Sequence, residues 1–226
     1  MKDEKLHMMQ RAFRATLDAF ARPGSVHKIE PFSDEGPGHR MLDAHLETAV
    51  RLFVDQAVSF AMIDSEPEQV AAYLARETHA KKATVPEADF VIIPSSAGST
   101  REFEAISSAQ AGDLASPEKG ALVIMGVSCI ADHPSLPETD APSRSLSLSR
   151  APKADDLMVF EVSGPGVAGS AQFALDRDAW AQARIARGDE FPCGVDILFV
   201  AADGAIVAIP RSSKVASVES SIKAVD

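Results

Sequence analysis

Apolar residues recur at helical or strand spacing along most of the chain, and the order of these segments predicts the fold class. Met9, Phe13 and Leu17 repeat at helical spacing and predict an amphipathic helix over residues 7–21. The same reasoning predicts a helix at 42–53, a strand at 58–63 and a helix that begins with a capping box at Ser65 and Glu68. Strands are predicted at 90–93 and 121–128, with a short helix between them at 101–108, and a further strand at 157–162. A last helix is predicted at 177–187, beginning after Asp176 and ending at Gly188. Helices that alternate with short apolar strands predict an α/β fold, a three-layer sandwich on a mixed sheet.

The strongest local signal lies near the C-terminus, where Asp203-Gly204 separates two apolar runs at 195–200 and 205–209. An Asp-Gly pair in this position predicts a β-hairpin with a type I′ turn, because that turn needs positive φ at both central residues. Such a hairpin brings its first residues beside its last ones. We therefore expect Asp196 to be a neighbour of Arg211.

Two segments depart from the pattern of apolar elements. Residues 132–155 hold several prolines among serines and acidic residues, and the segment is longer than the usual connections of a compact domain. We interpret it as a flexible insert, either functional or disordered, with composition favouring disorder. Residues 212–226 look like a polar tail. The whole chain, 1–226, is expected to form a single domain.

The charge balance and the absence of long apolar runs narrow the class of protein. The chain has 33 acidic and 22 basic residues, a formal net charge of −11, which argues against a nucleic-acid surface. No apolar run approaches the roughly 18 residues of a membrane span, and the first residues lack the apolar region of a signal peptide. We expect a cytoplasmic protein without membrane contact, in which Cys129 and Cys193 stay reduced.

The segment Gly164–Gly169 fits the dinucleotide fingerprint G-x-G-x-x-G and follows a predicted strand. The fingerprint requires a helix at its third glycine, whereas here the next predicted helix begins only near Asp176. A plain turn between strands is the favoured interpretation. A stand-alone nucleotide-binding enzyme that uses this turn remains the alternative.

No constellation of catalytic or metal-ligating residues is evident. The six histidines and two cysteines show no spacing typical of a metal site, and no paired general acid and base can be identified. We therefore assign no catalytic residue and no metal or other cofactor.

Arg22 and Arg211 are the candidate binding residues, together with Asp196. Each arginine lies next to a proline at the end of a predicted element, where loops place functional groups on a rigid frame. A guanidinium group binds phosphate or phosphonate oxygens in bidentate geometry. The structural interpretation is favoured over binding: Arg211 pairs with Asp196 across the hairpin and fixes the loop, and Arg14 does similar work on the first helix.

Two motifs lie at opposite ends of the chain. They are Phe13-Arg14, Leu17, Ala19 and Arg22-Pro23-Gly24 near the N-terminus, and FPCGVD at 191–196, the apolar hairpin and IPRSS at 209–213 near the C-terminus. Together they resemble the PhnH family of bacterial phosphonate metabolism. The resemblance spans roughly residues 7–215. It implies a fold similar to the large domain of pyridoxal-phosphate-dependent transferases, without the cofactor or its lysine.

The resemblance also implies a function as a subunit of the carbon-phosphorus lyase core complex. With the partner subunits PhnG, PhnI and PhnJ, such a subunit helps to form α-D-ribose 1-methylphosphonate 5-triphosphate from ATP and methylphosphonate. It also implies that the isolated chain forms a homodimer. The chain lacks the three closely spaced cysteines that the radical iron-sulfur subunit needs, so we do not expect it to be that subunit. Because no paired catalytic acid and base can be identified, we expect a non-catalytic or assembly role, with direct substrate binding as the other possibility.

Overall fold

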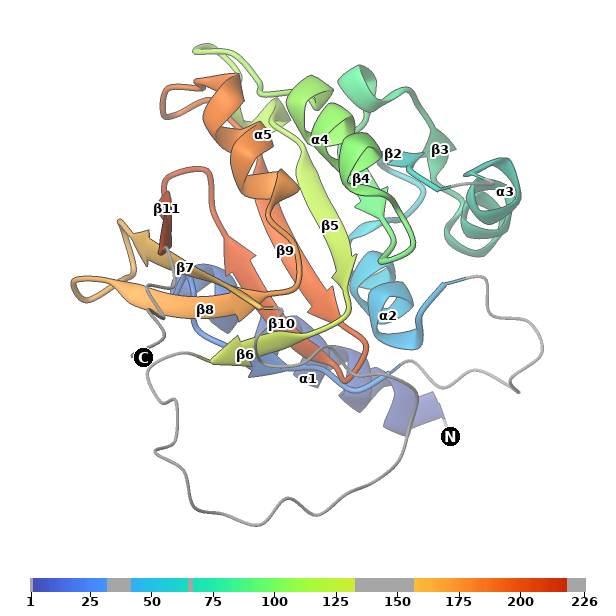
Figure 1. The fold of residues 1–226 in the computed structure, drawn as a ribbon. Helices are drawn as coiled ribbons and strands as arrows, with labels where there is room; N and C mark the ends of the chain where they lie inside the picture. Colours follow the sequence, from blue (N-terminus) through green and yellow to red (C-terminus); the bar gives the residue numbers. More distant parts are fainter. Residues whose placement is uncertain (1, 32–41, 65–66, 133–156, 219–226) are drawn as a thin grey trace.

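The computed structural model describes residues 2–31, 42–64, 67–132 and 157–218 (Figure 1). At its centre lies a seven-stranded mixed sheet in which the strands are ordered β1-β10-β9-β5-β4-β2-β3. Strands β3, β2, β4, β5 and β9 run parallel to one another, whereas β10 is antiparallel to both of its neighbours, β9 and β1. The strands are β1 (His27–Lys28), β2 (Ser59–Met62), β3 (Lys81–Lys82), β4 (Phe90–Ile93), β5 (Leu122–Val127), β9 (Asp196–Ala201) and β10 (Ala205–Ile209).

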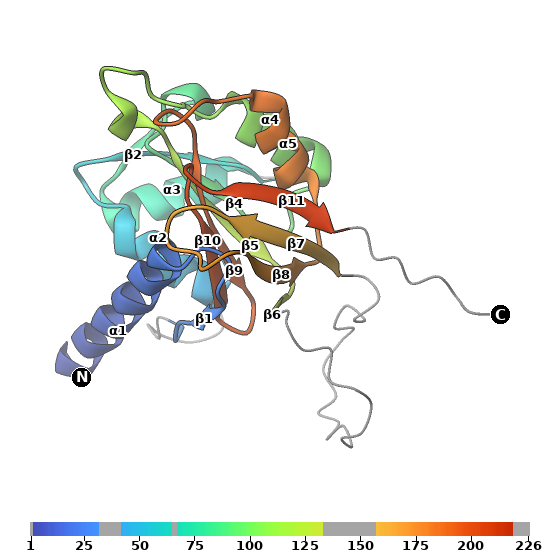
Figure 2. The ribbon, with the colours of Figure 1, turned by 90° about the vertical axis from the view of Figure 1, so that its left-hand side faces the viewer.

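A second, antiparallel sheet was not predicted from the sequence. Its four strands are ordered β11-β7-β8-β6 and comprise β6 (Ile130–Asp132), β7 (Met158–Ser163), β8 (Ala171–Leu175) and β11 (Lys214–Val218). Figure 2 shows this small sheet packed on one face of the main sheet. The expectation of an α/β fold on a mixed sheet is thus confirmed, and one outer layer is part helix and part sheet.

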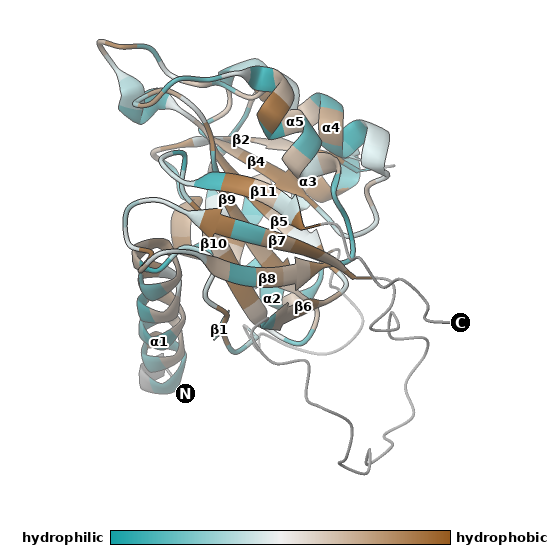
Figure 3. Ribbon diagram, turned by 60° about the vertical axis from the view of Figure 1, so that its left-hand side comes forward, coloured by the Kyte–Doolittle hydropathy of each residue, from teal (hydrophilic) through white to brown (hydrophobic). Residues whose placement is uncertain are grey.

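Five helices complete the layers of the described structure. They are α1 (Lys2–Ala21), α2 (Ala44–Phe53), α3 (Pro67–Thr78), α4 (Ser99–Ser108) and α5 (Ala179–Arg187). Helices α1, α2 and α3 cover one face of the main sheet, while α4, α5 and the small sheet cover the other. The strands therefore alternate between two cores: Ile92 packs toward α2 and α3, and its neighbours Val91 and Ile93 pack toward α4 and α5. Figure 3 shows the buried strands as largely hydrophobic.

The predicted hairpin forms, but its turn differs from the prediction. The register pairs Val200 with Ile206, so the loop has three residues, and Gly204 donates to the carbonyl of Ala201. Of the loop residues only Gly204 has a positive φ, of 84°. The type I′ prediction was therefore wrong, and the geometry is that of a type I turn followed by a left-handed glycine. Asp203 stabilises the turn by accepting a hydrogen bond from the backbone of Ala205.

Two predicted boundaries need correction. The prediction of a polar tail at 212–226 is wrong for Lys214–Val218, which forms β11 and pairs with β7. This pairing uses backbone hydrogen bonds, which form whether or not the side chains are apolar. Asp178, not Asp176, is the N-cap residue of α5, while the Asp176 carboxylate accepts from the backbone of Ser128 instead. Gly188 ends α5 in the left-handed conformation, as predicted. Of the predicted insert at 132–155, Asp132 belongs to β6 and the rest lies outside the described residues, as do the serine of the Ser65 capping box and residues 219–226.

Candidate functional site

Asp196 and Arg211 lie side by side where β9 begins and β10 has just ended. The Asp196 carboxylate accepts hydrogen bonds from the backbone N–H of Arg211 at 2.7 Å and from its Nε at 3.0 Å, and it forms an ion pair with the guanidinium. Both side chains are largely buried, with 23% and 16% of their surface exposed. The hairpin thus places the two residues as the sequence predicted.

The remaining donors of Arg211 bind backbone carbonyls from another part of the chain. One amino nitrogen donates to Pro117 and the other to Gly120 at 3.1 Å, both of which precede β5. A Cβ at position 120 would lie 2.3 Å from the Arg211 guanidinium, so glycine is required there for close approach. Arg211 therefore ties the end of the hairpin to the start of the central strand, as the structural interpretation expected.

Arg184, which reasoning from the sequence missed, lies close to this pair. This residue of α5 donates to the carbonyls of Ile209, Pro210 and Ser213. No ion pair joins it to a carboxylate in the described part of the chain, and burial lowers the pKa of its guanidinium to about 10. The signal that could have found it is its place on the inner face of a predicted helix.

A cavity of about 210 Å³ opens beside these arginines. Its lining combines three cations, Arg184, Arg211 and Lys214, with two hydroxyl residues that follow the hairpin. One carboxylate, that of Asp189, also lines it, and this group is held in an ion pair by Arg187. The cavity is thus an electropositive site in an acidic chain.

Arg22, the remaining candidate from the sequence, lies apart from this cavity. Its side chain is 59% exposed at the end of α1 and pairs with Asp18 one turn earlier. Within the described residues it shares no hydrogen bond or ion pair with Asp196 or Arg211. Nearby, Ser25 is hydrogen-bonded to His27, whose pKa is lowered by partial burial and by the charge of Arg22.

The Gly164–Gly169 segment is a turn that joins β7 to β8, with no helix after it. It therefore lacks the helix N-terminus that binds pyrophosphate in the dinucleotide fingerprint. Its glycines allow close backbone contacts instead: a Cβ on Gly166 would lie 2.3 Å from the carbonyl of Ala21, and one on Gly164 would lie 3.2 Å from that of Ser212. The turn geometry agrees with the structural interpretation.

Comparison with known proteins gives two matches that cover nearly the whole chain. Residues 2–216 match the family model described as bacterial phosphonate metabolism protein (PhnH). The chain belongs to the PhnH family. It is also 28% identical over 207 residues to a putative C-P lyase subunit protein, HtxG, from Stutzerimonas stutzeri, covering 91% of this chain and 85% of that protein.

The two motifs that resemble the PhnH family meet in space, although about 170 residues separate them in the sequence. The backbone N–H of Gly24, which ends the first motif, donates to the carbonyl of Ala208 in the hairpin. The glycine turn lies against both motifs, at Pro23 on one side and Ser212 on the other. The PhnH motifs and the glycine turn therefore form one continuous structural unit.

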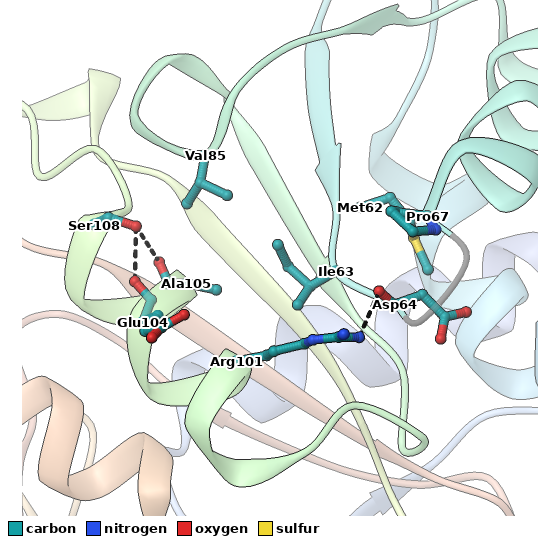
Figure 4. Close-up of a pocket in the computed structure, with 9 residues that line it drawn as sticks. All are labelled: Met62, Ile63, Asp64, Pro67, Val85, Arg101, Glu104, Ala105 and Ser108. Atoms are coloured by element: carbon teal, nitrogen blue, oxygen red, sulfur yellow. Dashed lines mark hydrogen bonds between the residues drawn. The ribbon is translucent and has the colours of Figure 1, made fainter.

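A second pocket of this PhnH-family chain, of about 330 Å³, lies where β2 and α4 face each other (Figure 4). Helix α3, which follows β2, and α4, which follows β4, cover opposite faces of the sheet, and such switch points bind ligands in many α/β proteins. Arg101 reaches across the pocket to the carbonyl of Asp64, at 2.9 Å. The hydroxyl of Ser108 donates to Glu104 of its own helix. The pocket is a second candidate binding site; because distant segments line it, sequence reasoning missed it.

A buried ion pair lies under α4 and α5. Glu102 is fully buried and accepts hydrogen bonds from Arg177 at 3.1 Å and from the backbone of Trp180 at 2.9 Å. Burial nevertheless raises the pKa of Glu102 above its ordinary value of 4.5, because desolvation outweighs the attraction of Arg177. The pair joins two helices and has the character of a structural element.

The raised pKa of Glu102 predicts a pH dependence of stability. The folded state binds this proton more tightly than the unfolded state, so the contribution of Glu102 is greatest below pH 4.5 and decreases as the pH rises through its folded pKa. We expect the free energy of unfolding of the native protein to fall relative to that of Glu102→Gln as the pH rises over this range, measured by urea unfolding at several pH values. A native protein that gains stability relative to Glu102→Gln as the pH rises would show instead that Arg177 lowers this pKa.

Metal-ligating clusters and membrane-spanning helices are both absent from the described part of the chain. Among these residues, no group of three or more histidine, cysteine, aspartate or glutamate side chains is placed to hold a metal ion. No helix in the same ranges has the length and apolar character needed to cross a membrane.

Proposed function

We propose that this chain is a cytoplasmic subunit of a carbon-phosphorus lyase complex. Membership of the PhnH family and similarity to a putative C-P lyase subunit support a role in phosphonate catabolism. In this proposal PhnG, PhnI and PhnJ are its partners, and the complex forms α-D-ribose 1-methylphosphonate 5-triphosphate from ATP and methylphosphonate. Its fold resembles the large domain of pyridoxal-phosphate-dependent transferases without using their cofactor.

The role of the chain in that complex is assembly, not catalysis. Asp196 and Arg211 form hydrogen bonds with each other, and Arg211 also donates to a neighbouring backbone carbonyl. Both residues therefore behave as structural residues. The Ser108 hydroxyl in the second pocket is bonded within its own helix, without a general base that would activate it. Both features support a subunit that shapes its partners.

One observation carries the proposal: helix α1 presents an apolar stripe to solvent. Leu6, Phe13 and Leu17 recur along one side of the helix and are 57%, 43% and 51% exposed. The N-terminal half of α1 extends beyond the main sheet (Figure 2). A row of large apolar residues on a projecting helix is typical of a surface that a partner protein covers. Phe13 and Leu17 also belong to the N-terminal PhnH motif.

The α1 stripe should be required for assembly. We expect the double variant Phe13→Glu, Leu17→Glu to lose the complex, because central apolar anchors each contribute about 2 kcal/mol or more to binding, roughly a thirtyfold change in affinity. The measurement is native mass spectrometry after co-expression with PhnG, PhnI and PhnJ. Leu114→Glu is the matched control, since Leu114 is 81% exposed and lies outside α1.

The same experiment tests the proposal at two levels. If the unmodified chain recovers none of the three subunits, the assignment as a subunit is wrong. If the double variant assembles like the control, the chain is a subunit but α1 is not its interface. Expressed alone, the chain should appear at twice its monomer mass, since a homodimer is part of the proposal.

A further inference from the structure

The cavity beside Arg184 is electropositive although the chain as a whole carries a formal charge of −11. The guanidinium of Arg184 donates three hydrogen bonds, all to carbonyl oxygens. A guanidinium has five N–H groups, so two of them are without a protein acceptor among the described residues. Lys214, on the rim, adds an exposed ammonium group. The nearby carboxylates of Asp196 and Asp189 act on the charge of Arg184, but each already forms an ion pair with another arginine. A buried cation without a carboxylate of its own is unfavourable, and an anion that binds beside it would offset this cost.

Ser213 provides a second, independent indication. Its side chain lines the same cavity, only 6% of the residue is exposed, and its hydroxyl oxygen is buried without a hydrogen-bond partner. Buried hydroxyl groups are nearly always hydrogen-bonded, and an exception calls for an explanation. A ligand oxygen that accepts from this hydroxyl would supply the missing partner.

The size of the cavity limits the ligand. The cavity has a volume of about 210 Å³. It is smaller than the pockets of drug-sized ligands, which begin at about 300 Å³. A single phosphate or phosphonate group fits, and a nucleotide would enter only with a terminal phosphate.

We propose that this cavity binds a tetrahedral phosphorus oxyanion, held by Arg184, Lys214 and the hydroxyl of Ser213. The lowered pKa of Arg184 agrees with this assignment, because a bound anion offsets the burial of its charge. The group is either a small free anion or the end of a nucleotide. The proposal is independent of the subunit function: it concerns binding by this chain alone and does not require that a complex forms.

The test measures binding of three probes to the full chain by isothermal titration calorimetry: inorganic phosphate, methylphosphonate and ATP, with chloride added to equal ionic strength. We expect saturable binding of at least one probe. Ser213→Ala and Lys214→Ala should each weaken it about tenfold or more, since hydrogen bonds to charged groups contribute about that factor. Lys81→Ala, which removes an exposed lysine from the far edge of the sheet, should bind like the native protein.

Both site variants are expected to fold, because Ser213→Ala removes only an unpaired hydroxyl and Lys214 is exposed. Binding of the small anions that is weakened by both variants supports a free-anion site, and binding of ATP alone, weakened in the same way, supports a nucleotide phosphate. Absence of binding by all three probes overturns the proposal. It is equally overturned if Ser213→Ala and Lys214→Ala bind as tightly as Lys81→Ala.

Discussion

Replacing Asp196 by alanine is expected to lower the free energy of unfolding by about 3–5 kcal/mol, because it leaves the largely buried Arg211 guanidinium without its carboxylate. The value should lie toward the lower end, since both side chains keep some contact with solvent. The backbone N–H of Arg211 also loses its acceptor. Urea unfolding followed by circular dichroism measures the change.

Two further variants separate the ion pair from other effects of the substitution. The double variant Asp196→Ala, Arg211→Met should recover much of the lost stability, because no unpaired charge stays buried. Glu30→Ala breaks the exposed pair with Arg11, in which both side chains are about 60% exposed, and should cost less than about 1 kcal/mol. If Asp196→Ala matches Glu30→Ala in stability, the pair is not structural and Asp196 is available for a ligand.

The sequence predicted those parts of the fold that depend on local signals. Alternating apolar residues defined the buried strands, and Gly188 ended α5 as expected because a left-handed residue closes a helix. The small sheet was missed for a physical reason. Strand β11 is held by backbone hydrogen bonds at a sheet edge and has mostly exposed side chains, so its sequence resembles that of a tail.

The candidate site was predictable only where the chain folds back on itself. The hairpin brings together Asp196 and Arg211, which are 15 residues apart in the sequence. The Asp-Gly pair at its turn predicted this hairpin. Arg184 approaches the same place from a different helix, which requires knowledge of how α5 packs. Arg22 and Arg211 each lie next to a proline in the sequence. A position beside a proline in a loop does not determine which other loop the residue contacts in the folded protein. Tertiary packing therefore decided the site.

The structure also gives the glycine turn a different meaning from the one its fingerprint suggested. A nucleotide fingerprint and a close backbone crossing both select glycine, and only the next element of the chain distinguishes them. Here that element is the strand β8, and the turn lies against Pro23 and Ser212 from the two PhnH motifs. Packing thus accounts for part of the motif residues that carry the resemblance. It does not account for the exposed motif residues of α1, which are the ones that we propose bind a partner.

Replacing Trp180 by alanine is expected to destabilise the protein by about 3–5 kcal/mol. Trp180 is fully buried between α5 and both sheets, with its ring centroid 4.8 Å from that of Phe160 in the small sheet and 4.8 Å from that of Phe199 in the main sheet. Its removal leaves a cavity at the only aromatic cluster that joins the two sheets in the described structure. Trp180→Phe, which keeps a ring but loses the hydrogen bond to the carbonyl of Arg177, should cost less.

The measurement for Trp180 is urea unfolding followed by circular dichroism, because Trp180 is the sole tryptophan of the chain and its fluorescence is lost in the variants. Leu114→Ala is the control for loss of an apolar side chain at an 81% exposed position and should change stability by no more than about 0.5 kcal/mol. A Trp180→Ala variant as stable as this control would contradict the packing described here. A large loss with a lower m-value would show that the small sheet separates first, since less surface is then exposed in the main transition.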